Sequence, residues 1–153
     1  MKILLISDTH SNTSDAIRIL RADGSFDMFF HMGDTWQDAA GIRNESGVPM
    51  RAVSGNMDGL RVGPAVEVFT LEGVRFLLTH GDLFGIHRGL RDLNAEAVRR
   101  KADVVCFGHT HAAFDGMFDD RRFINPGAMK HGKKSYGILT VENETIVYEA
   151  VTI

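Results

Sequence analysis

Short apolar runs in this sequence are repeatedly followed by Asp, Asn or His side chains with a glycine close by. Carboxylates, amide oxygens and imidazoles are hard to borderline ligands that suit Mn²⁺, iron, Ni²⁺, Zn²⁺ or Mg²⁺. The glycines let the chain pass close to a metal without a Cβ in the way. The pattern therefore predicts a metal site with oxygen and nitrogen ligands. The five clusters are Asp8 and His10; His31, Gly33 and Asp34; Ser54, Gly55, Asn56 and Asp58; His80, Gly81 and Asp82; and Gly108, His109 and His111.

Each cluster on its own has an ordinary structural explanation, because Asp, Asn and Gly are also the residues of turns and helix caps. The segment 108–111 is stronger evidence, since two imidazoles two residues apart at a strand end seldom serve packing. Five clusters on successive strands are hard to explain as turns, and a buried rim of unpaired polar groups is costly without a ligand. Clusters that supply as many as seven ligands offer too many for one ion. They suit two ions that share a carboxylate, an arrangement used for phosphoryl displacement.

The clusters follow segments whose apolar patterns predict strands, and amphipathic segments between them predict helices. If the strands are parallel, their carboxyl ends form one rim around a ligand crevice. Parallel units at the start and antiparallel hairpins at the end favour two stacked sheets with helices outside, in a single domain over residues 1–153. The predicted strands are Lys2–Ile6, Phe26–Phe30, Met50–Val53, Ala65–Leu71, Val74–Leu78, Ala102–Phe107, Ser135–Val141 and Thr145–Thr152. The predicted helices are Ser14–Ala22, Thr35–Arg43 and the longest, His87–Lys101, and residues 115–120 are predicted to be rich in turns.

The composition is that of an ordinary globular protein, with 44% apolar and 24% charged residues in a chain of 153. A formal net charge of −3 argues against a broad basic face for nucleic acid. The apolar runs are far shorter than the roughly 18 residues needed to cross a bilayer. No cleavage site follows the first of them, so we expect a cytoplasmic protein. The single cysteine, Cys106, excludes an internal disulfide and is expected in the core.

The order of the clusters resembles the calcineurin-like metallophosphoesterase superfamily, whose pattern reads Asp-x-His, Gly-Asp, Gly-Asn-His-Asp, His and Gly-His-x-His. The later segments 125–128 and 135–136 resemble its small single-domain phosphodiesterase (YfcE-like) branch. The resemblance covers nearly the whole chain. It implies a four-layer α/β/β/α sandwich with two mixed sheets and a hydrolase that uses two divalent metal ions. The matching segments are Asp8-Thr9-His10, Gly33-Asp34, Gly55-Asn56-Met57-Asp58, His80-Gly81-Asp82 and Gly108-His109-Thr110-His111.

The resemblance also implies a ligand set and a mechanism. Asp34 would bridge the two ions, and a hydroxide between them would attack the phosphorus of a phosphate ester. Asn56 would be a ligand that also orients the phosphate, so Asp34 and Asn56 are the predicted catalytic pair. Manganese is the first choice of metal, with nickel, iron, zinc or magnesium as alternatives. The first ion would be held by Asp8, His10, Asp34 and His111, and the second by Asp34, Asn56, His80 and His109.

One position departs from the family pattern. Met57 stands where the pattern has a histidine, which is the proposed acid for the leaving group. Asp58, which would orient that histidine, is still present. A thioether has no proton to give, so activity toward phosphoproteins cannot be carried over.

The remaining polar and aromatic residues are weaker candidates for a direct role at the site. His131 lies in a basic loop that either contacts phosphate or is simply solvated, and the solvated loop is favoured. His31 is expected to be packed behind the site, and His87 to begin a helix. Trp36 is expected to pack at the start of its helix.

Three functions fit the pattern to different degrees. The favoured one is a phosphodiesterase acting on a small phosphodiester or other phosphate ester. A phosphomonoesterase or nucleotidase is the runner-up within the enzyme class. A binding scaffold similar to the retromer subunit of this fold is the alternative outside it, and loss of metal ligands would favour it. None of the seven ligands is lost, and the sequence leaves open whether the chain forms a homo-oligomer.

Overall fold

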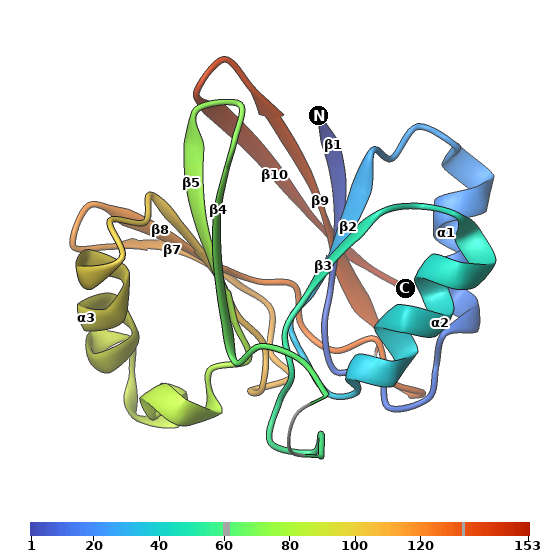
Figure 1. Cartoon of the computed structure of the whole chain (residues 1–153), viewed down its shortest axis with the longest axis horizontal. Coiled ribbons are helices and arrows are strands. Elements are labelled where there is room, and N and C mark those ends of the chain that lie inside the picture. Colours follow the sequence, from blue (N-terminus) through green and yellow to red (C-terminus); the bar gives the residue numbers. More distant parts are fainter. Residues whose placement is uncertain (60–61, 133) are drawn as a thin grey trace.

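The computed structural model describes residues 1–59, 62–132 and 134–153. Two five-stranded sheets face each other, and helices cover the outer face of each (Figure 1). The fold is the α/β/β/α sandwich that the sequence predicts. The first sheet has the order β10-β9-β1-β2-β3 and the second the order β4-β5-β6-β8-β7.

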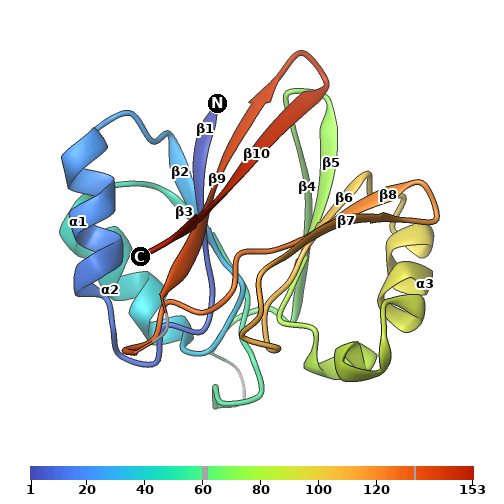
Figure 2. The same cartoon turned by 180° about the vertical axis from the view of Figure 1, so that it is seen from behind.

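The first sheet combines a parallel centre with an antiparallel hairpin. Strand β1 pairs in parallel with β2, which pairs in parallel with β3, while β9 runs antiparallel to β1 and to β10. Helices α1 and α2 lie side by side on its outer face (Figures 1 and 2). The bounds are β1 Lys2–Ile6, α1 Ser14–Asp23, β2 Met28–His31, α2 Trp36–Ser46, β3 Met50–Ala52, β9 Ser135–Glu142 and β10 Thr145–Thr152.

The second sheet has three parallel strands, β5, β6 and β8, with an antiparallel strand at each edge. Helix α3 covers its outer face, opposite to α1 and α2 (Figure 2). The bounds are β4 Val66–Leu71, β5 Val74–Thr79, the short 3₁₀ turns η1 Asp82–Phe84 and η2 Ile86–Arg88, α3 Arg91–Arg99, β6 Val104–Cys106, β7 Phe114–Phe118 and β8 Arg121–Asn125.

Strand β1 shows why the central strands are unbroken apolar runs. Alternate side chains of a strand point to opposite faces. Ile3 and Leu5 pack between the sheets, whereas Leu4 and Ile6 pack beneath α1 and α2. A third cluster lies between the second sheet and α3, so every layer boundary is filled with apolar side chains. Cys106 is buried between the sheets, as predicted.

The predicted helix His87–Lys101 is wrong in its start and in being the longest. Helix α3 covers only Arg91–Arg99 and is shorter than α2. Gly89 has φ 122° and ψ −172°, a conformation that interrupts helical hydrogen bonding. His87 therefore lies in the separate turn η2.

The segment at 115–120 is a hairpin rather than a run of turns. Strands β7 and β8 pair from Phe114 with Asn125 to Phe118 with Arg121, and the turn is at Asp119 and Asp120. The Asp115-Gly116 pair, which suggested a turn, lies inside β7. The other predicted strands and helices are present with ends shifted by a few residues, as in β2, which ends at His31 rather than Phe30.

Within the described part of the chain, no helix is long and apolar enough to cross a membrane.

Candidate metal centre

The loops after the parallel strands of both sheets meet at one end of the sandwich, the lower end in Figure 1. Main-chain hydrogen bonds join them. The Asp8 amide donates to the Gly33 carbonyl at 2.9 Å, and the Gly108 amide donates to the His80 carbonyl at 3.0 Å. Between the sheets, the His109 amide donates to Asp8 Oδ2 at 3.1 Å. This end of the molecule therefore collects the predicted ligands from both sheets.

Two groups of ligand atoms lie at this end, each with its atoms within 4.8 Å of one another. The first is Asp8, His10 and His111, and the second is Asp8, Asp34 and His80. Asp8 Oδ1 lies 3.2 Å from His111 Nε2 and 3.8 Å from His80 Nε2, so it belongs to both. The Nε2 atom of His80 is also 3.2 Å from Asp34 Oδ2.

His109 extends the second group. Its Nδ1 atom lies 3.2 Å from His80 Nε2. Six of the seven predicted ligands are therefore within contact distance of a neighbour in the set. Asn56, the seventh, is exposed in the loop after β3, where the next residue's amide donates to Asp34 Oδ1 at 3.0 Å.

Two ligand atoms at this site are buried without a hydrogen-bond partner among the described residues. They are Asp8 Oδ1 and His10 Nε2, which are 3.9 Å apart. A buried carboxylate oxygen without a partner costs free energy that a cation would recover. The chain thus fits a metal by its own geometry, and the donor set of carboxylate oxygens and imidazole nitrogens suits divalent transition ions.

Neighbouring groups fix the orientation of these side chains. Asp8 Oδ2 accepts hydrogen bonds from Ser7 Oγ at 2.6 Å and from the His109 amide, which leaves Oδ1 turned toward the imidazoles. His80 Nδ1 donates to the Met32 carbonyl at 2.7 Å. This bond places a proton on Nδ1, so in the neutral ring the lone pair of Nε2 faces Asp34, the arrangement typical of histidine ligands.

The ionisation of the site reflects its concentrated negative charge. Burial opposes the charged form of Asp34, but the hydrogen bond with His80, the charge of that ring and the hydrogen bond from the Met57 amide together outweigh burial and hold the pKa of the carboxyl below its usual value. Burial likewise acts to lower the pKa of His80, yet the hydrogen bond to Asp34 and the charge of Asp8 raise it. In His109, burial and the neighbouring His80 lower the pKa, which favours the neutral ring that a ligand needs.

The backbone is strained at the same residues. Non-glycine residues rarely adopt positive φ, and such conformations cluster where function maintains them. Five of the seven predicted ligands adopt it. Their φ values are 53° at Asp8, 43° at His10, 47° at Asp34, 70° at His109 and 61° at His111.

Two glycines are required by the close packing of the loops. A Cβ on Gly33, whose φ is 96°, would lie 2.8 Å from His80 Nδ1. A Cβ on Gly108 would meet Ser7 Oγ and lie 2.8 Å from Asp8 Oδ2. Any larger residue at these positions would displace a ligand or the group that orients it.

Asp58 joins the loop after β3 to the start of α2. Its carboxylate accepts hydrogen bonds from the amides of Gly55 at 2.7 Å, Trp36 at 2.8 Å and Asp34 at 3.3 Å. Both oxygens are thus engaged with the backbone around Asp34. Met57, beside it, is 65% exposed at the rim of the site.

His31 is a packed group, as predicted. It is fully buried, its Nδ1 accepts from the Gly33 amide at 3.2 Å, and its Nε2 lies 3.0 Å from Thr9 Oγ1. Burial lowers its pKa to about 4, so the ring is neutral at physiological pH. Trp36 packs against the apolar cluster beneath α1 and α2, also as predicted.

His131 is exposed in the loop between β8 and β9. Lys134 of the same loop forms an ion pair with Asp15 of α1 at 2.7 Å. Lys133, which adds to the basic character of this loop, lies outside the described residues. A contact between His131 and substrate stays a prediction.

Two further residues at the site were not predicted to be there. The ring of His87 lies against that of His109, with centroids 4.7 Å apart, because the turn η2 brings it to the rim. Asn125 is buried, and its Nδ2 atom donates to the Gly108 carbonyl and to Thr110 Oγ1, both at 3.0 Å. The Asn-Pro-Gly-Ala segment therefore holds the loop that carries His109 and His111.

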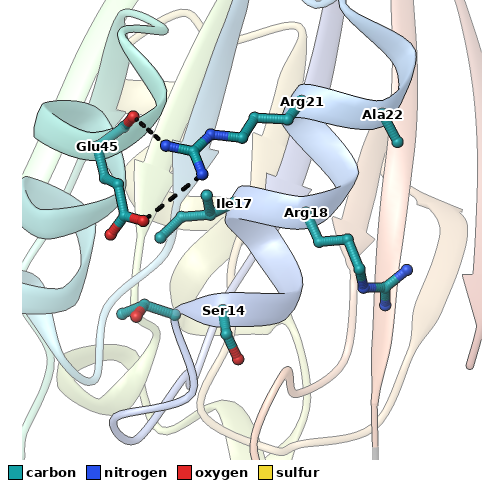
Figure 3. A pocket seen from close by; sticks show the side chains of 7 residues that line it. Ser14, Ile17, Arg18, Arg21, Ala22 and Glu45 are labelled. Atoms are coloured by element: carbon teal, nitrogen blue, oxygen red, sulfur yellow. Dashed lines mark hydrogen bonds and ion pairs between the residues drawn. The ribbon is translucent and has the colours of Figure 1, made fainter.

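A cavity of about 560 Å³ lies away from this centre, along the helical layer (Figure 3). Its basic side chains are already engaged. Arg21 donates to the Glu45 carbonyl at 2.9 Å and pairs with its carboxylate, and Arg18 pairs with Asp15 at 3.0 Å. This cavity supplies no group to the candidate site.

Comparisons with known proteins agree with the class that the fold and the site define. Residues 1–144 match the calcineurin-like phosphoesterase superfamily domain. A probable metallophosphoesterase of Bacillus subtilis, YsnB, is 32% identical over 149 residues, which are 94% of this chain and 86% of that protein. The chain belongs to the calcineurin-like phosphoesterase superfamily.

Solved structures show the same fold over the whole length. An archaeal protein described as a novel phosphodiesterase has a TM-score of 0.80 and 26% identity, with 100% of both chains covered. Vps29 from Entamoeba histolytica in complex with zinc has a TM-score of 0.78 over 99% of both chains. At 17% identity, the Vps29 likeness shows the fold alone.

Proposed function

We propose that this protein is a metal-dependent phosphodiesterase that hydrolyses a P–O bond of a small phosphodiester at the end of the sandwich where the ligand loops meet. The observation that carries this proposal is the position of Asp8 Oδ1, which is buried, unpartnered among the described residues and common to both ligand groups. Membership of a phosphoesterase superfamily supports the reaction class.

We assign two divalent ions to the site. Asp8, His10, Asp34 and His111 would hold the first, and Asp34, Asn56, His80 and His109 the second, with Asp34 as the bridge. The two groups of ligand atoms in the structure share Asp8 instead, so Asp8 and Asp34 are both candidates for the carboxylate that bridges the ions. The mixed oxygen and nitrogen donors favour manganese, with iron, nickel and zinc as close alternatives.

The ions would supply hydroxide at neutral pH and neutralise negative charge on the phosphoryl oxygens. The chain's own residues would position the reacting groups. Asp34 is fixed by the Met57 amide, and the carbonyl of Met32 fixes the ring of His80. The exposed amide of Asn56 would donate to a phosphate oxygen, and His131 is a further candidate for contact with phosphate.

A phosphodiester fits the charge of the metal-loaded site, and the lack of an acid at position 57, better than a phosphomonoester does. Two divalent ions with two carboxylates leave the site positive, which suits a substrate with a single negative charge. Met57 cannot protonate a departing alkoxide, so leaving groups that depart as stable anions should react best. The phosphodiesterase description of the archaeal structural relative is consistent with this choice.

The experiment is a panel of phosphate esters with graded leaving groups, assayed with manganese. We expect efficient hydrolysis of aryl diesters, poor hydrolysis of alkyl monoesters and a steep dependence of rate on the leaving group's pKa. Met57→His should flatten that dependence, and Met57→Leu, the matched control, should not. Preference for alkyl monoesters would overturn the diesterase assignment. Identical slopes for Met57→His and the parent protein would show that position 57 is not that of the acid.

A further inference from the structure

An apolar cavity of about 300 Å³ adjoins the candidate metal centre. One wall is the loop of the ligands His109 and His111, which contributes Thr110 and Ala112. The facing wall includes Ile86 and Leu90, from either side of the segment that carries His87. The ring of His87 also lies against that of His109, so the segment that forms the facing wall contacts a predicted ligand.

The walls of this cavity are fixed in position. Thr110 Oγ1 accepts hydrogen bonds from Asn125 Nδ2 at 3.0 Å and from the Ala112 amide at 3.3 Å. Ile86 and Phe107 belong to the buried cluster between the second sheet and α3. A pocket that is already formed loses little free energy to ordering when a ligand binds.

The cavity differs in chemistry from the site beside it. The eight described residues that line it carry no ionisable side chain. Phe114 lies at its edge, 41% exposed, with its ring centroid 6.3 Å from that of Phe107. A charged phosphoryl group therefore belongs among the histidines, and an uncharged group belongs against the phenylalanines.

We propose that this cavity binds an aromatic organic group of the phosphate ester whose phosphoryl group lies at the metal centre. The inference rests on the proposed function and adds the substrate class to it, namely esters with a planar aromatic substituent. Phe107 and Phe114 would contact the ring, and Thr110 and Ala112 would line the side of the cavity next to the metal ligands.

The test compares two phosphonates that cannot be hydrolysed as esters, phenylphosphonate and methylphosphonate. Their binding to the manganese-loaded protein is measured by titration calorimetry. Both present the same phosphoryl oxygens, so a difference in affinity reports the cavity. Burial of the ring should make phenylphosphonate bind about tenfold more tightly than methylphosphonate.

Two variants of β7 form a matched pair for this test. Phe114 and Phe118 lie on the same face of the strand and are similarly exposed, but only Phe114 lines the cavity. Phe114→Gln should weaken phenylphosphonate binding about fivefold and leave methylphosphonate binding unchanged. Phe118→Gln should change neither.

The outcomes separate this inference from the proposed function. Equal affinities for the two phosphonates in the metal-loaded protein would overturn the cavity assignment and leave the phosphodiesterase proposal intact. So would an equal loss in both phenylalanine variants. Failure of the metal-loaded protein to bind either phosphonate would overturn both proposals.

Discussion

Asp8 and Asp34 are both buried carboxylates, but their surroundings differ. Asp8 has one oxygen that accepts hydrogen bonds from Ser7 and the His109 amide, and the other has no hydrogen-bond partner among the described residues. Asp34 has one oxygen bound by the Met57 amide and the other 3.2 Å from His80. Each could bridge two ions, and substitution distinguishes them.

Asp34→Asn should lower the metal content below two ions per chain and reduce hydrolysis by about 10³-fold or more, because a bridging carboxylate relieves the repulsion between two cations. Asp8→Asn, the matched comparison, should retain the second ion, whose proposed ligands are Asp34, Asn56, His80 and His109. The measurements are elemental analysis and rate on the same samples. Two ions per chain and a nearly normal rate in Asp34→Asn would assign the bridge elsewhere.

His31 should make stability depend on pH. Its pKa is lowered from 6.5 to about 4 in the folded protein, because burial disfavours the charged ring. Between these values the unfolded state binds a proton that the folded state does not. The free energy of unfolding therefore has its full value above pH 6.5. It falls by up to about 3 kcal/mol as the pH drops to 4.

The measurement is urea unfolding of the metal-free protein across this pH range. His31→Gln should be less stable at pH 7 and show a shallower fall in the free energy of unfolding between pH 6.5 and 4. His131→Gln, which changes an exposed histidine, should keep the slope of the parent protein. A slope unchanged in His31→Gln would mean that this ring does not control the acid sensitivity.

At the scale of the elements, the loop after β6 depends on a residue at the end of β8. Asn125 donates to both Gly108 and Thr110 and so fixes the segment that carries two of the predicted ligands. Groups that orient metal ligands typically affect metal affinity by about 10–100-fold. Asn125, at the end of β8, therefore helps to orient two predicted metal ligands, although it is not itself a predicted ligand.

Asn125→Ala should weaken manganese binding by about tenfold or more and destabilise the fold by about 1–3 kcal/mol. Asn94→Ala is the matched control, because Asn94 is also a buried asparagine, but its hydrogen bond goes to Asp119, away from the site. It should lose similar stability and retain metal affinity. An equal loss of affinity in both variants would reduce the role of Asn125 to general stability.

The elements show what sequence patterns can and cannot predict. The strands with two buried faces, such as β1, are visible because the four consecutive apolar residues Ile3–Ile6 are typical of a central strand. The β7–β8 hairpin is not, because β7 is an exposed edge strand whose Asp115-Gly116 pair is typical of a turn. The predicted helix His87–Lys101 begins too early, because the conformation of Gly89 breaks the helix before Arg91.

At the scale of the whole molecule, the candidate metal centre lies where loops of the two sheets meet. The loops of the first sheet supply Asp8, His10, Asp34 and Asn56, and those of the second supply His80, His109 and His111. That these seven positions lie at one end of the molecule could be predicted from the sequence, because each follows a recognisable strand or matches a family motif, and their binding of metal stays a prediction. The places of His87 and Asn125 could not be predicted, since they depend on how distant loops pack.

Because the ligands come from both sheets, metal binding should stabilise the whole fold. At about 100 times the dissociation constant, a ligand adds about 2.7 kcal/mol, which raises the melting temperature of a domain of this size by about 5–10 °C. Thermal unfolding with manganese and after chelation measures this change. Asp34→Asn should show a much smaller rise, and no rise in the parent protein would argue against a site shared by the sheets.

The most direct test of the central claim is a titration of the metal-free protein with manganese while hydrolysis of bis(4-nitrophenyl) phosphate is followed. The account predicts no hydrolysis at zero manganese, confirmed by elemental analysis, and a rate that rises to a plateau at two ions per chain. Full hydrolysis by protein from which all metal has been removed would contradict it.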